Sequence, residues 1–224
     1  MVSGKRHALI IGESELELVP KELWRHPVVL ARARKLEKNP GEMLLQSGEV
    51  YKAMRGIPEE GRRGRPDLVH FALTIATDSP AFAEGRLEVI LHLRDNSIVR
   101  IREGLRPPKE YSRFCGLAEQ LLLKGRVPAE GDWLMKIEPG KKTLAELAEE
   151  TGTETLIFDS GGELTTVSEL SGILGGEGKT LVVGGFPHGT FHSRPEGRTI
   201  TISKKELLAG TVVGFISAAL GDQR

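Results

Sequence analysis

Short apolar runs alternate with helical stretches along the last third of the chain. Three of the runs predict buried strands, over residues 154–159, 180–185 and 198–203. The segments between and after them carry apolar side chains at helical spacing, which predicts helices over residues 165–174 and 204–220. The polar run Ser160–Glu163 predicts a turn. Strands that alternate with helices favour an α/β fold, in which helices cover a parallel sheet.

The earlier part of the chain predicts a strand, a hairpin and several helices. The apolar run His7–Glu13 stops at Gly12 and predicts a buried strand followed by a turn. Two β-type runs flank Asp95 and Asn96, which is a hairpin pattern within residues 86–103. Helical spacing predicts helices over residues 21–38 with a break near Pro27, over 49–55, from Asp67 onward, over 111–124 and over 143–150; a short strand is predicted over 133–137.

The composition is that of an ordinary globular protein without net charge. The 224 residues include 31 basic and 31 acidic side chains, and 39% are hydrophobic. The single cysteine, Cys115, excludes internal disulfides and sites built from several thiolates, and its position between Phe114 and Gly116 favours a packing role. The N-terminus lacks the pattern of a signal peptide, and no apolar run is long enough to span a bilayer. We therefore expect a cytoplasmic protein without a membrane segment.

Charge is nevertheless unevenly distributed along the chain. Residues 100–113 hold five basic and two acidic side chains, whereas residues 143–174 hold seven acidic ones and no lysine or arginine. A neutral protein polarised in this way presents one face to an anion. The stretches RRGRPDLVH (Arg62–His70) and RPPKEYSRFCGL (Arg106–Leu117) place arginine in loops punctuated by glycine and proline, and a predicted helix follows each loop.

These arginine-bearing loops suit a phosphate ligand. A guanidinium group grips phosphate through two parallel hydrogen bonds, and nucleic acids gain most of their affinity from phosphate contacts. Arg106, Lys109 and Arg113 are spaced by three and four residues, so they share a face wherever the backbone is helical. Asp67 follows Arg65 by two residues and can either hold its guanidinium or cap the next helix. For a single short cluster, a solvated charged surface would be the preferred interpretation.

Glycines gather after the predicted strand at residues 180–185. The run VVGGFPHGTF (Val182–Phe191) places three of them at the carboxyl end of a parallel strand, where α/β sheets bind ligands. A plain strand-to-loop turn explains the same residues equally well. The spacing differs from the dinucleotide fingerprint, which disfavours a nicotinamide enzyme.

Two other patterns predict neither a nucleotide-binding site nor a metal site. GEGKT (Gly176–Thr180) is not a phosphate-binding P-loop, because Ile173 stands where its first glycine is required and a strand follows instead of a helix. His70, His188 and His192 have no acidic or histidine partners at ligand spacing, so we expect no metal site.

Four stretches together resemble the nucleolar-essential-protein family of ribosome biogenesis: RGRPDLVHFALT, PPKEYSRFCGLAEQLL, VVGGFPHG and ITISKKELLAG. The resemblance covers nearly the whole chain, and RPD and RFxGL are its most specific motifs. Members are SPOUT-class methyltransferases that methylate N1 of a pseudouridine in small-subunit ribosomal RNA. The resemblance implies an α/β fold with a trefoil-knotted parallel sheet flanked by helices and a β-hairpin/helical insertion. It implies one SPOUT domain over residues 1–224, with a basic RNA-binding region at about residues 56–126.

The same resemblance implies the ligands and partners. S-adenosylmethionine would be the methyl donor and small-subunit ribosomal RNA the substrate. The chain would form a homodimer and would be an archaeal, cytoplasmic member, with ribosomal assembly proteins as further candidate partners.

The family's functional positions carry over residue by residue. The resemblance implies that Arg65 contacts RNA and that Asp67 supports it. Further RNA contacts fall on Arg106, Lys109 and Arg113, where Lys109 keeps the charge of an arginine in relatives but loses its two-pronged geometry. Cofactor contacts fall on Leu156, Gly184, Gly189, Ile202, Ser203, Lys204, Lys205, Glu206 and Leu207. The segment from Ile202 lacks the Asn-Tyr-Pro of some relatives, so we expect backbone groups to carry binding there.

The implied reaction assigns roles to two of these residues. Pseudouridine exposes an N1–H that uridine lacks, and the base must leave its stack to reach a cofactor pocket. Asp67 is the candidate for the base that removes the N1 proton, and Arg65 is the candidate cation for the developing enolate charge. The alternative is a non-catalytic RNA-binding factor for small-subunit assembly, which the same arginines would serve; an intact cofactor pocket favours the enzyme. A SPOUT enzyme for transfer RNA fits less well, because RPD and RFxGL do not belong to that pattern.

Overall fold

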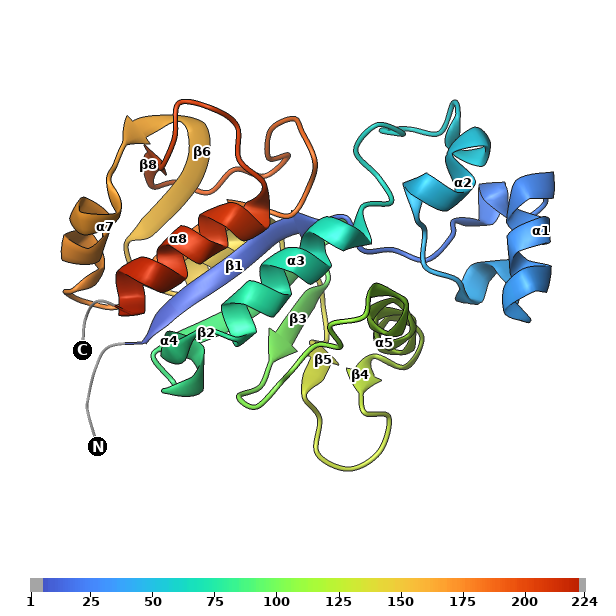
Figure 1. The fold of residues 1–224 in the computed structure, drawn as a ribbon, viewed down its shortest axis with the longest axis horizontal. Helices are drawn as coiled ribbons and strands as arrows, with labels where there is room; N and C mark the ends of the chain where they lie inside the picture. Colours follow the sequence, from blue (N-terminus) through green and yellow to red (C-terminus); the bar gives the residue numbers. More distant parts are fainter. Residues whose placement is uncertain (1–5, 222–224) are drawn as a thin grey trace.

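The computed structural model describes residues 6–221, whose strands form one eight-stranded sheet in the order β4-β5-β3-β2-β1-β7-β6-β8 (Figure 1). The parallel part consists of β1 (His7–Ser14), β2 (Leu87–Leu93), β6 (Thr155–Leu164), β7 (Thr180–Gly184) and β8 (Arg198–Thr201). The antiparallel part consists of β3 (Ile98–Ile101), β4 (Arg126–Val127) and β5 (Met135–Ile137). The predicted α/β class is confirmed, and the predicted hairpin is β2–β3.

Helices cover both faces of the sheet. One face carries α3 (Pro66–Thr77), α4 (Pro80–Ala83), α5 (Tyr111–Lys124), α7 (Val167–Leu174) and α8 (Ala209–Gly221), whereas α6 (Leu144–Glu150) packs on the other. Figure 1 shows α3 and α8 lying side by side across the sheet. No helix within residues 6–221 combines the length and apolarity that crossing a membrane requires.

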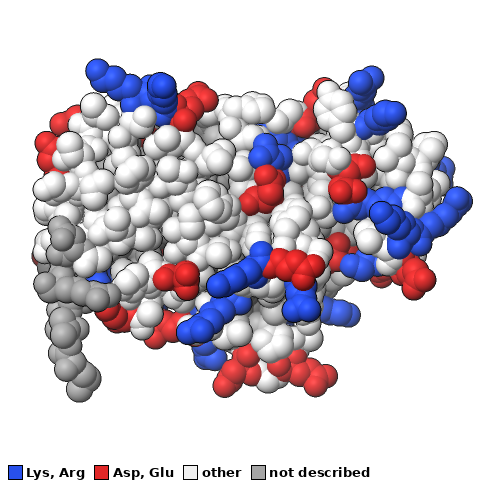
Figure 2. All heavy atoms as spheres, in the orientation of Figure 1, with Lys and Arg blue, Asp and Glu red and all other residues white. Residues whose placement is uncertain are grey.

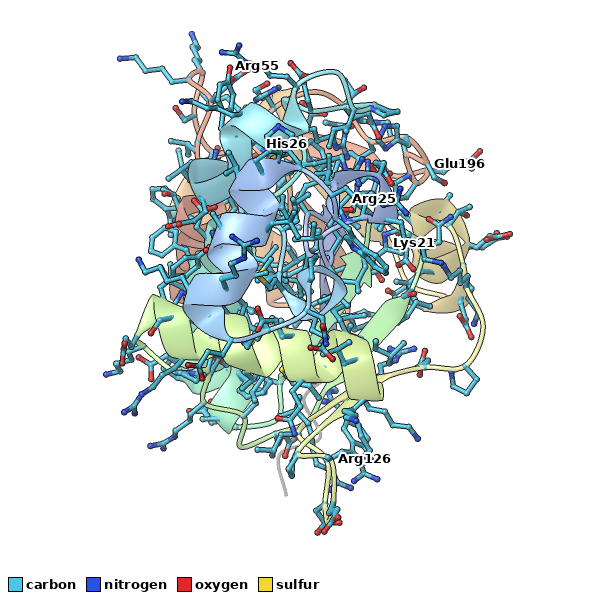
Figure 3. All side chains as sticks on the ribbon, turned by 90° about the vertical axis from the view of Figure 1, so that its right-hand side faces the viewer. Lys21, Arg25, His26, Arg55, Arg126 and Glu196 are labelled. Carbon is cyan, nitrogen blue, oxygen red and sulfur yellow. The ribbon has the colours of Figure 1, made fainter. Side chains whose placement is uncertain are left out.

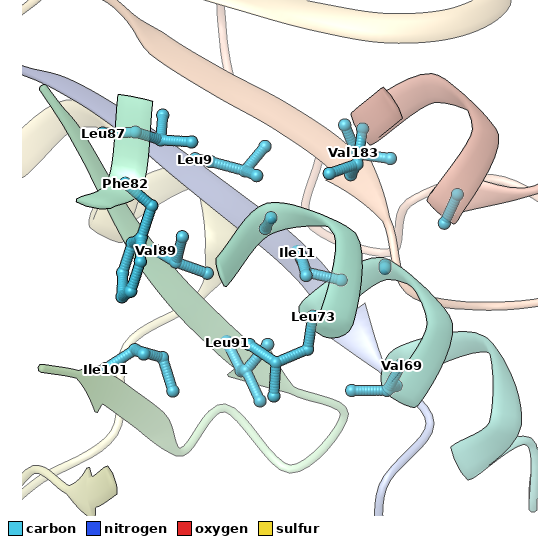
Figure 4. Packing of buried hydrophobic residues seen from close by; sticks show 14 of the residues in the cluster. Leu9, Ile11, Val69, Leu73, Phe82, Leu87, Val89, Leu91, Ile101 and Val183 are labelled. Atoms are coloured by element: carbon cyan, nitrogen blue, oxygen red, sulfur yellow. The ribbon is translucent and has the colours of Figure 1, made fainter. Parts of the chain in front are cut away.

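The central strand β1 has apolar side chains on both faces. Leu9 and Ile11 belong to the cluster that packs against α3 and α8 (Figure 4), whereas Ile10 belongs to the cluster under α6. Successive side chains of a strand point to opposite faces, so a strand covered on both sides reads as a continuous apolar run. This explains why the run at His7–Glu13 predicted the strand correctly.

A small lobe extends beyond the sheet and contains its own apolar cluster. It comprises two short 3-10 helices, η1 (Lys21–Leu23) and η2 (Pro40–Glu42), with α1 (Pro27–Leu36) and α2 (Ser47–Met54). Figure 1 shows this α1–α2 lobe at the end of the molecule farthest from α7. The break predicted near Pro27 is present, because Pro27 opens α1 and His26 Nδ1 accepts a hydrogen bond from the Val28 N–H at 3.2 Å.

The turn predicted at Ser160–Glu163 is wrong. Strand β6 continues to Leu164, and its register with β8 shifts between Phe158 and Glu163. A Cβ at Gly162 would lie 2.5 Å from the carbonyl carbon of Ile200, so this glycine permits close approach of β8. Gly161 and Gly162 therefore belong to a strand that pairs irregularly with β8, and they do not form a turn.

The last helix also begins later than predicted. The sequence predicted helix from residue 204, but α8 begins at Ala209 and residues 202–208 form a loop. Local hydrogen bonds hold this loop: Thr201 Oγ1 donates to the Ser203 carbonyl at 2.8 Å, and the Lys205 N–H donates to Ser203 Oγ at 3.0 Å. Such side-chain bonds compete with helical ones.

The fully buried His92 makes stability depend on pH. The Glu13 N–H donates to its Nδ1 at 3.2 Å, so Nε2 carries the proton and donates to the Lys142 carbonyl at 2.9 Å. Burial lowers the pKa of His92 below its usual 6.5, which means that the unfolded chain takes up a proton before the folded one does. The contribution of neutral His92 to stability is therefore fully present above pH 6.5 and is lost as the pH falls through the lowered pKa of the folded state.

We expect His92→Gln to weaken the pH dependence of the thermal midpoint between pH 6.5 and about 5, measured by calorimetry. A residual slope remains, because burial also lowers the pKa of His7. A variant with the slope of the unaltered protein would contradict this assignment.

Candidate functional site

A pocket lies beside β6 and β7 and the start of α8. Its lining comes from three segments, 158–160, 183–191 and 201–212, and from Leu68 of α3. It encloses about 890 Å³, including the part open to solvent. The carboxyl ends of parallel strands are where open α/β sheets bind ligands, so the location agrees with the glycine-rich run after β7.

The pocket wall combines apolar side chains with polar and charged groups. Phe186, Leu208 and Val212 supply apolar surface, while Asp159 and Lys205 supply charge. Arg194 Nη1 donates to Asp159 Oδ2 at 2.7 Å, and this hydrogen bond lowers the pKa of the Asp159 carboxyl. A wall that combines apolar surface with fixed polar groups is typical of sites for small organic ligands.

Six of the nine residues predicted to contact the cofactor line the pocket: Gly184, Gly189, Ile202, Lys205, Glu206 and Leu207. Ser203 and Lys204 belong to the same loop but are outside the lining. Leu156 is fully buried in the core beneath α3 and α8, two residues before Phe158, which does line the pocket. The loops after β7 and β8 thus line one pocket, whereas Leu156 lies in the core and outside its lining.

Two glycines in the loop after β7 stand where the backbone leaves no room for a side chain or adopts a conformation that favours glycine. A Cβ at Gly185 would lie 2.6 Å from Ser14 Oγ, because the backbone at Gly185 packs directly against the end of β1. Gly189 has φ of +98°, a conformation that residues with a side chain rarely adopt. The Gly189 backbone therefore shapes the pocket in a way that another residue would strain.

The Arg65–Asp67 pair stands at the entrance to α3. Arg65 Nε and Nη2 donate to the two Asp67 carboxylate oxygens at 2.8 and 2.7 Å. Arg65 is the N-cap residue and Pro66 opens the helix, so Asp67 holds the guanidinium and does not cap. The next residue, Leu68, lines the pocket, which places the pair beside it.

The other predicted RNA contacts lie around the start of α5. Arg106 and Lys109 are in the loop before Tyr111, so only Arg113 is helical and the shared helical face does not form. All three side chains are exposed, and Arg113 Nε lies 3.2 Å from Glu110 Oε2. Arg100, by contrast, is paired with Glu138 at 2.9 Å, which reduces the free charge of this region.

His70 connects this loop to α3. Its Nε2 lies 2.7 Å from the Pro108 carbonyl oxygen, and its ring stacks on Phe114 at a centroid distance of 4.4 Å. His70 is three residues from Asp67, so the two arginine-bearing segments are held to the same helix. Figure 2 shows charged side chains gathered around α5 and the α1–α2 lobe, and Figure 3 shows Lys21, Arg25 and Arg55 on that lobe.

Cys115 is a packed side chain, and the described residues hold no metal-binding cluster. Cys115 is buried in α5, and burial raises the pKa of its thiol, as the predicted packing role requires. Among residues 6–221, no group of three or more histidine, cysteine, aspartate or glutamate side chains could hold a metal ion.

Sequence reasoning missed a buried ion cluster behind the pocket wall. Arg62 Nη2 lies 2.5 Å from Glu13 Oε2, and Arg62 Nε lies 2.9 Å from Glu15 Oε1. Burial opposes ionisation of Glu13, but the N–H groups of Ser193 and His192 and the Arg62 charge outweigh it and lower the carboxyl pKa. Acidic residues directly after a buried strand were the signal that could have revealed the cluster.

Comparison with known proteins identifies relatives along the whole chain. The EMG1/NEP1 methyltransferase family matches residues 9–220. The ribosomal RNA small subunit methyltransferase Nep1 of Thermococcus kodakarensis is 42% identical over 219 residues, covering 95% of this chain and 98% of that protein. The Pyrococcus furiosus protein of the same name is 40% identical, covering 95% of each.

A solved structure shares the fold. The crystal structure of Archaeoglobus fulgidus Nep1 bound to S-adenosylhomocysteine has a TM-score of 0.86 at 27% identity, covering 97% of this chain and 98% of that chain. This likeness confirms the predicted SPOUT-type α/β class.

Replacing Gly189 by valine tests the pocket. The left-handed backbone costs a residue with a side chain about 1–2 kcal/mol, so the loop should shift and S-adenosylhomocysteine affinity should fall about five- to thirtyfold. Gly140→Val is the matched control, because Gly140 has φ of +84° with no atom near its Cβ position and lies outside the pocket lining. Isothermal titration measures both variants, and equal affinities for the two would remove the Gly189 loop from the site.

Proposed function

The chain belongs to the EMG1/NEP1 methyltransferase family, and on that premise we propose that it methylates small-subunit ribosomal RNA at N1 of a pseudouridine, with S-adenosylmethionine as donor. One observation carries the proposal: the pocket at β6 and β7 belongs to a fold shared with a relative bound to S-adenosylhomocysteine. Its mixed apolar and polar lining, adjacent to the Arg65–Asp67 pair, suits the donor and a nearby RNA base.

The cofactor would be held by the loops after β7 and β8. Gly184 and Gly189 would offer backbone groups on one side, and residues 202–207 would close the other. Ile202, Lys205, Glu206 and Leu207 would supply the contacts there, while Ser203 and Lys204 would support the loop. Leu156 would act from beneath, by packing the strand that carries Phe158.

We propose that two side chains of the protein remove the proton from N1 of the base and stabilise the resulting charge. When bound, the donor supplies the methyl group that forms the new N1–carbon bond. Asp67 would accept the N1 proton, and Arg65 would stabilise the charge that develops on the base oxygens. Each Asp67 oxygen accepts one hydrogen bond from Arg65 in this structure, which leaves a second lone pair on each oxygen for the N1 proton.

The RNA would bind across the basic segments within residues 56–126. Arg65, Arg106, Lys109 and Arg113 would contact phosphates, and the bond from His70 to Pro108 would keep them on one body. A duplex or loop bound there would present its target base towards Leu68 and the pocket.

Self-association would use the apolar face over α3 and α8. Figure 2 shows this part of the surface nearly free of charged side chains. Phe71 and Leu208 are 45% and 53% exposed, an unusual amount for large apolar side chains. A homodimer that buries this face, located in the cytoplasm with its RNA and ribosomal assembly proteins, is the arrangement we propose.

A non-catalytic assembly factor is the less favoured alternative. Such a protein would need the arginine surface but no cofactor pocket. The formed pocket and the relative bound to S-adenosylhomocysteine favour the enzyme.

The proposal is tested with two RNA oligomers that differ only in pseudouridine or uridine at one position. With S-adenosylmethionine, the protein should add one methyl group to the pseudouridine oligomer and none to the uridine oligomer, because only pseudouridine has an N1–H. Mass spectrometry of the nucleosides gives the readout. Equal methylation of both oligomers would contradict the N1 assignment, and methylation of neither, with no binding of the cofactor, would favour the assembly factor.

Replacing Arg113 by alanine should weaken RNA binding and spare the cofactor. Loss of one phosphate contact should lower the slope of log affinity against log salt by about one. Lys141→Ala is the control, because Lys141 also forms an exposed ion pair, with Asp95, and lies outside the proposed RNA-binding region at residues 56–126. RNA affinities measured by anisotropy that are equal for the two variants would remove Arg113 from the RNA surface.

A further inference from the structure

One buried guanidinium joins the arginine-bearing loop to the wall of the pocket. Arg62 is 7% exposed, and its Nη1 donates to the Thr190 carbonyl at 2.7 Å. The guanidinium also lies over the Phe186 ring, 3.8 Å from the centroid. Thr190 and Phe186 both line the pocket, so Arg62 contacts the wall through a backbone oxygen and an aromatic face.

Glu13 fixes both partners of this contact to the end of β1. Its carboxylate accepts hydrogen bonds from Arg62 Nη2 at 2.5 Å and from the N–H groups of His192 and Ser193 at 3.0 Å each. Glu13 itself has φ of +49° and is almost fully buried. The loop after β7 is thus held at Thr190 by Arg62 and at residues 192–193 by Glu13.

The chain is short between Arg62 and the RNA-facing pair. Three residues after Arg62, Arg65 is the N-cap residue of α3 and pairs with Asp67. The intervening Gly64 is itself fixed, since its carbonyl accepts the Ser47 N–H at 2.8 Å and a Cβ would lie 2.9 Å from that nitrogen. Arg62 and the start of α3 are therefore joined by a short backbone segment whose position is fixed by Ser47.

We propose that Arg62 is a positioning residue that couples occupancy of the cofactor pocket to RNA binding at Arg65 and Asp67. The inference rests on the proposed function and goes beyond it, because it assigns the communication between the two sites to one side chain. A ligand that orders Phe186 and Thr190 also orders Arg62 and the segment leading to Arg65. RNA binding to that segment must favour the cofactor by the same factor, because coupling between two binding equilibria is reciprocal.

The neighbouring Arg63 provides a matched control. It is as buried as Arg62, and its Nε and Nη2 donate to the two Glu17 oxygens at 2.8 and 2.7 Å. Its third hydrogen bond goes to the Pro58 carbonyl, within its own loop. Substitution of Arg63 therefore disturbs the same loop and a similar buried ion pair without touching the pocket wall.

The experiment measures the affinity of the full chain for a pseudouridine-containing RNA oligomer with and without saturating S-adenosylhomocysteine. For the unaltered protein we expect the product cofactor to tighten RNA binding at least about fivefold, the lower end of typical coupling. Arg62→Lys keeps the charge but loses the fork that reaches Thr190 and Glu13 together, so its ratio should fall towards one. Arg63→Lys should keep the ratio of the unaltered protein.

The outcomes distinguish failure of the coupling role from failure of the proposed methyltransferase function. If the unaltered protein binds S-adenosylhomocysteine but Arg62→Lys and Arg63→Lys have the same ratio, or if the unaltered protein shows a ratio of one, the coupling role is overturned and the methyltransferase stands. If the unaltered protein does not bind S-adenosylhomocysteine, the proposed function fails and this inference fails with it. Should Arg62→Lys not fold, Glu13→Gln replaces it: a folded variant should lose the coupling, and a ratio equal to that of the unaltered protein overturns the proposal.

Discussion

The buried carboxylate of Glu13 is the constraint on which the site depends. It ends the central strand and collects Arg62 and two backbone N–H groups from the loop after β7. A buried charge that loses its partner costs about 3–5 kcal/mol, so these three segments are stable only when assembled together. Glu15, also fully buried, pairs with Arg62 and Arg94 at 2.9 and 3.0 Å and extends the same cluster. The pocket wall is consequently anchored to the core of the sheet.

Sheet topology places the two halves of the proposed chemistry side by side. Strand β1 lies between β2 and β7, so the loop after β7 and the segment after β1 meet at one end of the sheet. Helix α3 starts at that same end, which brings Arg65 and Asp67 next to a pocket whose lining includes Leu68. The bond from His70 to Pro108 then attaches the loop of Arg106 and Lys109. A donor and a polyanionic substrate could therefore approach one another across the start of a single helix.

Sequence-based expectation and structure agree where local pattern decides and differ where long-range contact does. The helix predicted over residues 111–124 is α5, because its amphipathic period and the Gly125 C-cap are local properties. The turn predicted at Ser160–Glu163 is instead irregular strand, because pairing with β8 overrides the turn preference of glycine. Residues 202–208 are loop for the same kind of reason, and this loop supplies Ile202, Lys205, Glu206 and Leu207 to the pocket.

The sequence by itself determined the α/β class, the order of most elements, the motifs that identify the family, and six of the residues that line the pocket. The class and the order of elements follow from periodicity and turn chemistry, whereas the six pocket residues follow from the resemblance that the short motifs carry. Only the tertiary structure decided that Phe186 and Asp159 form the wall, that Arg100 is paired with Glu138, and that Arg62 joins Glu13 to Thr190 of the pocket wall. The physical reason is distance along the chain: Arg62 meets Glu13 across 49 residues and Thr190 across 128, and no local pattern encodes which buried charge will find which partner.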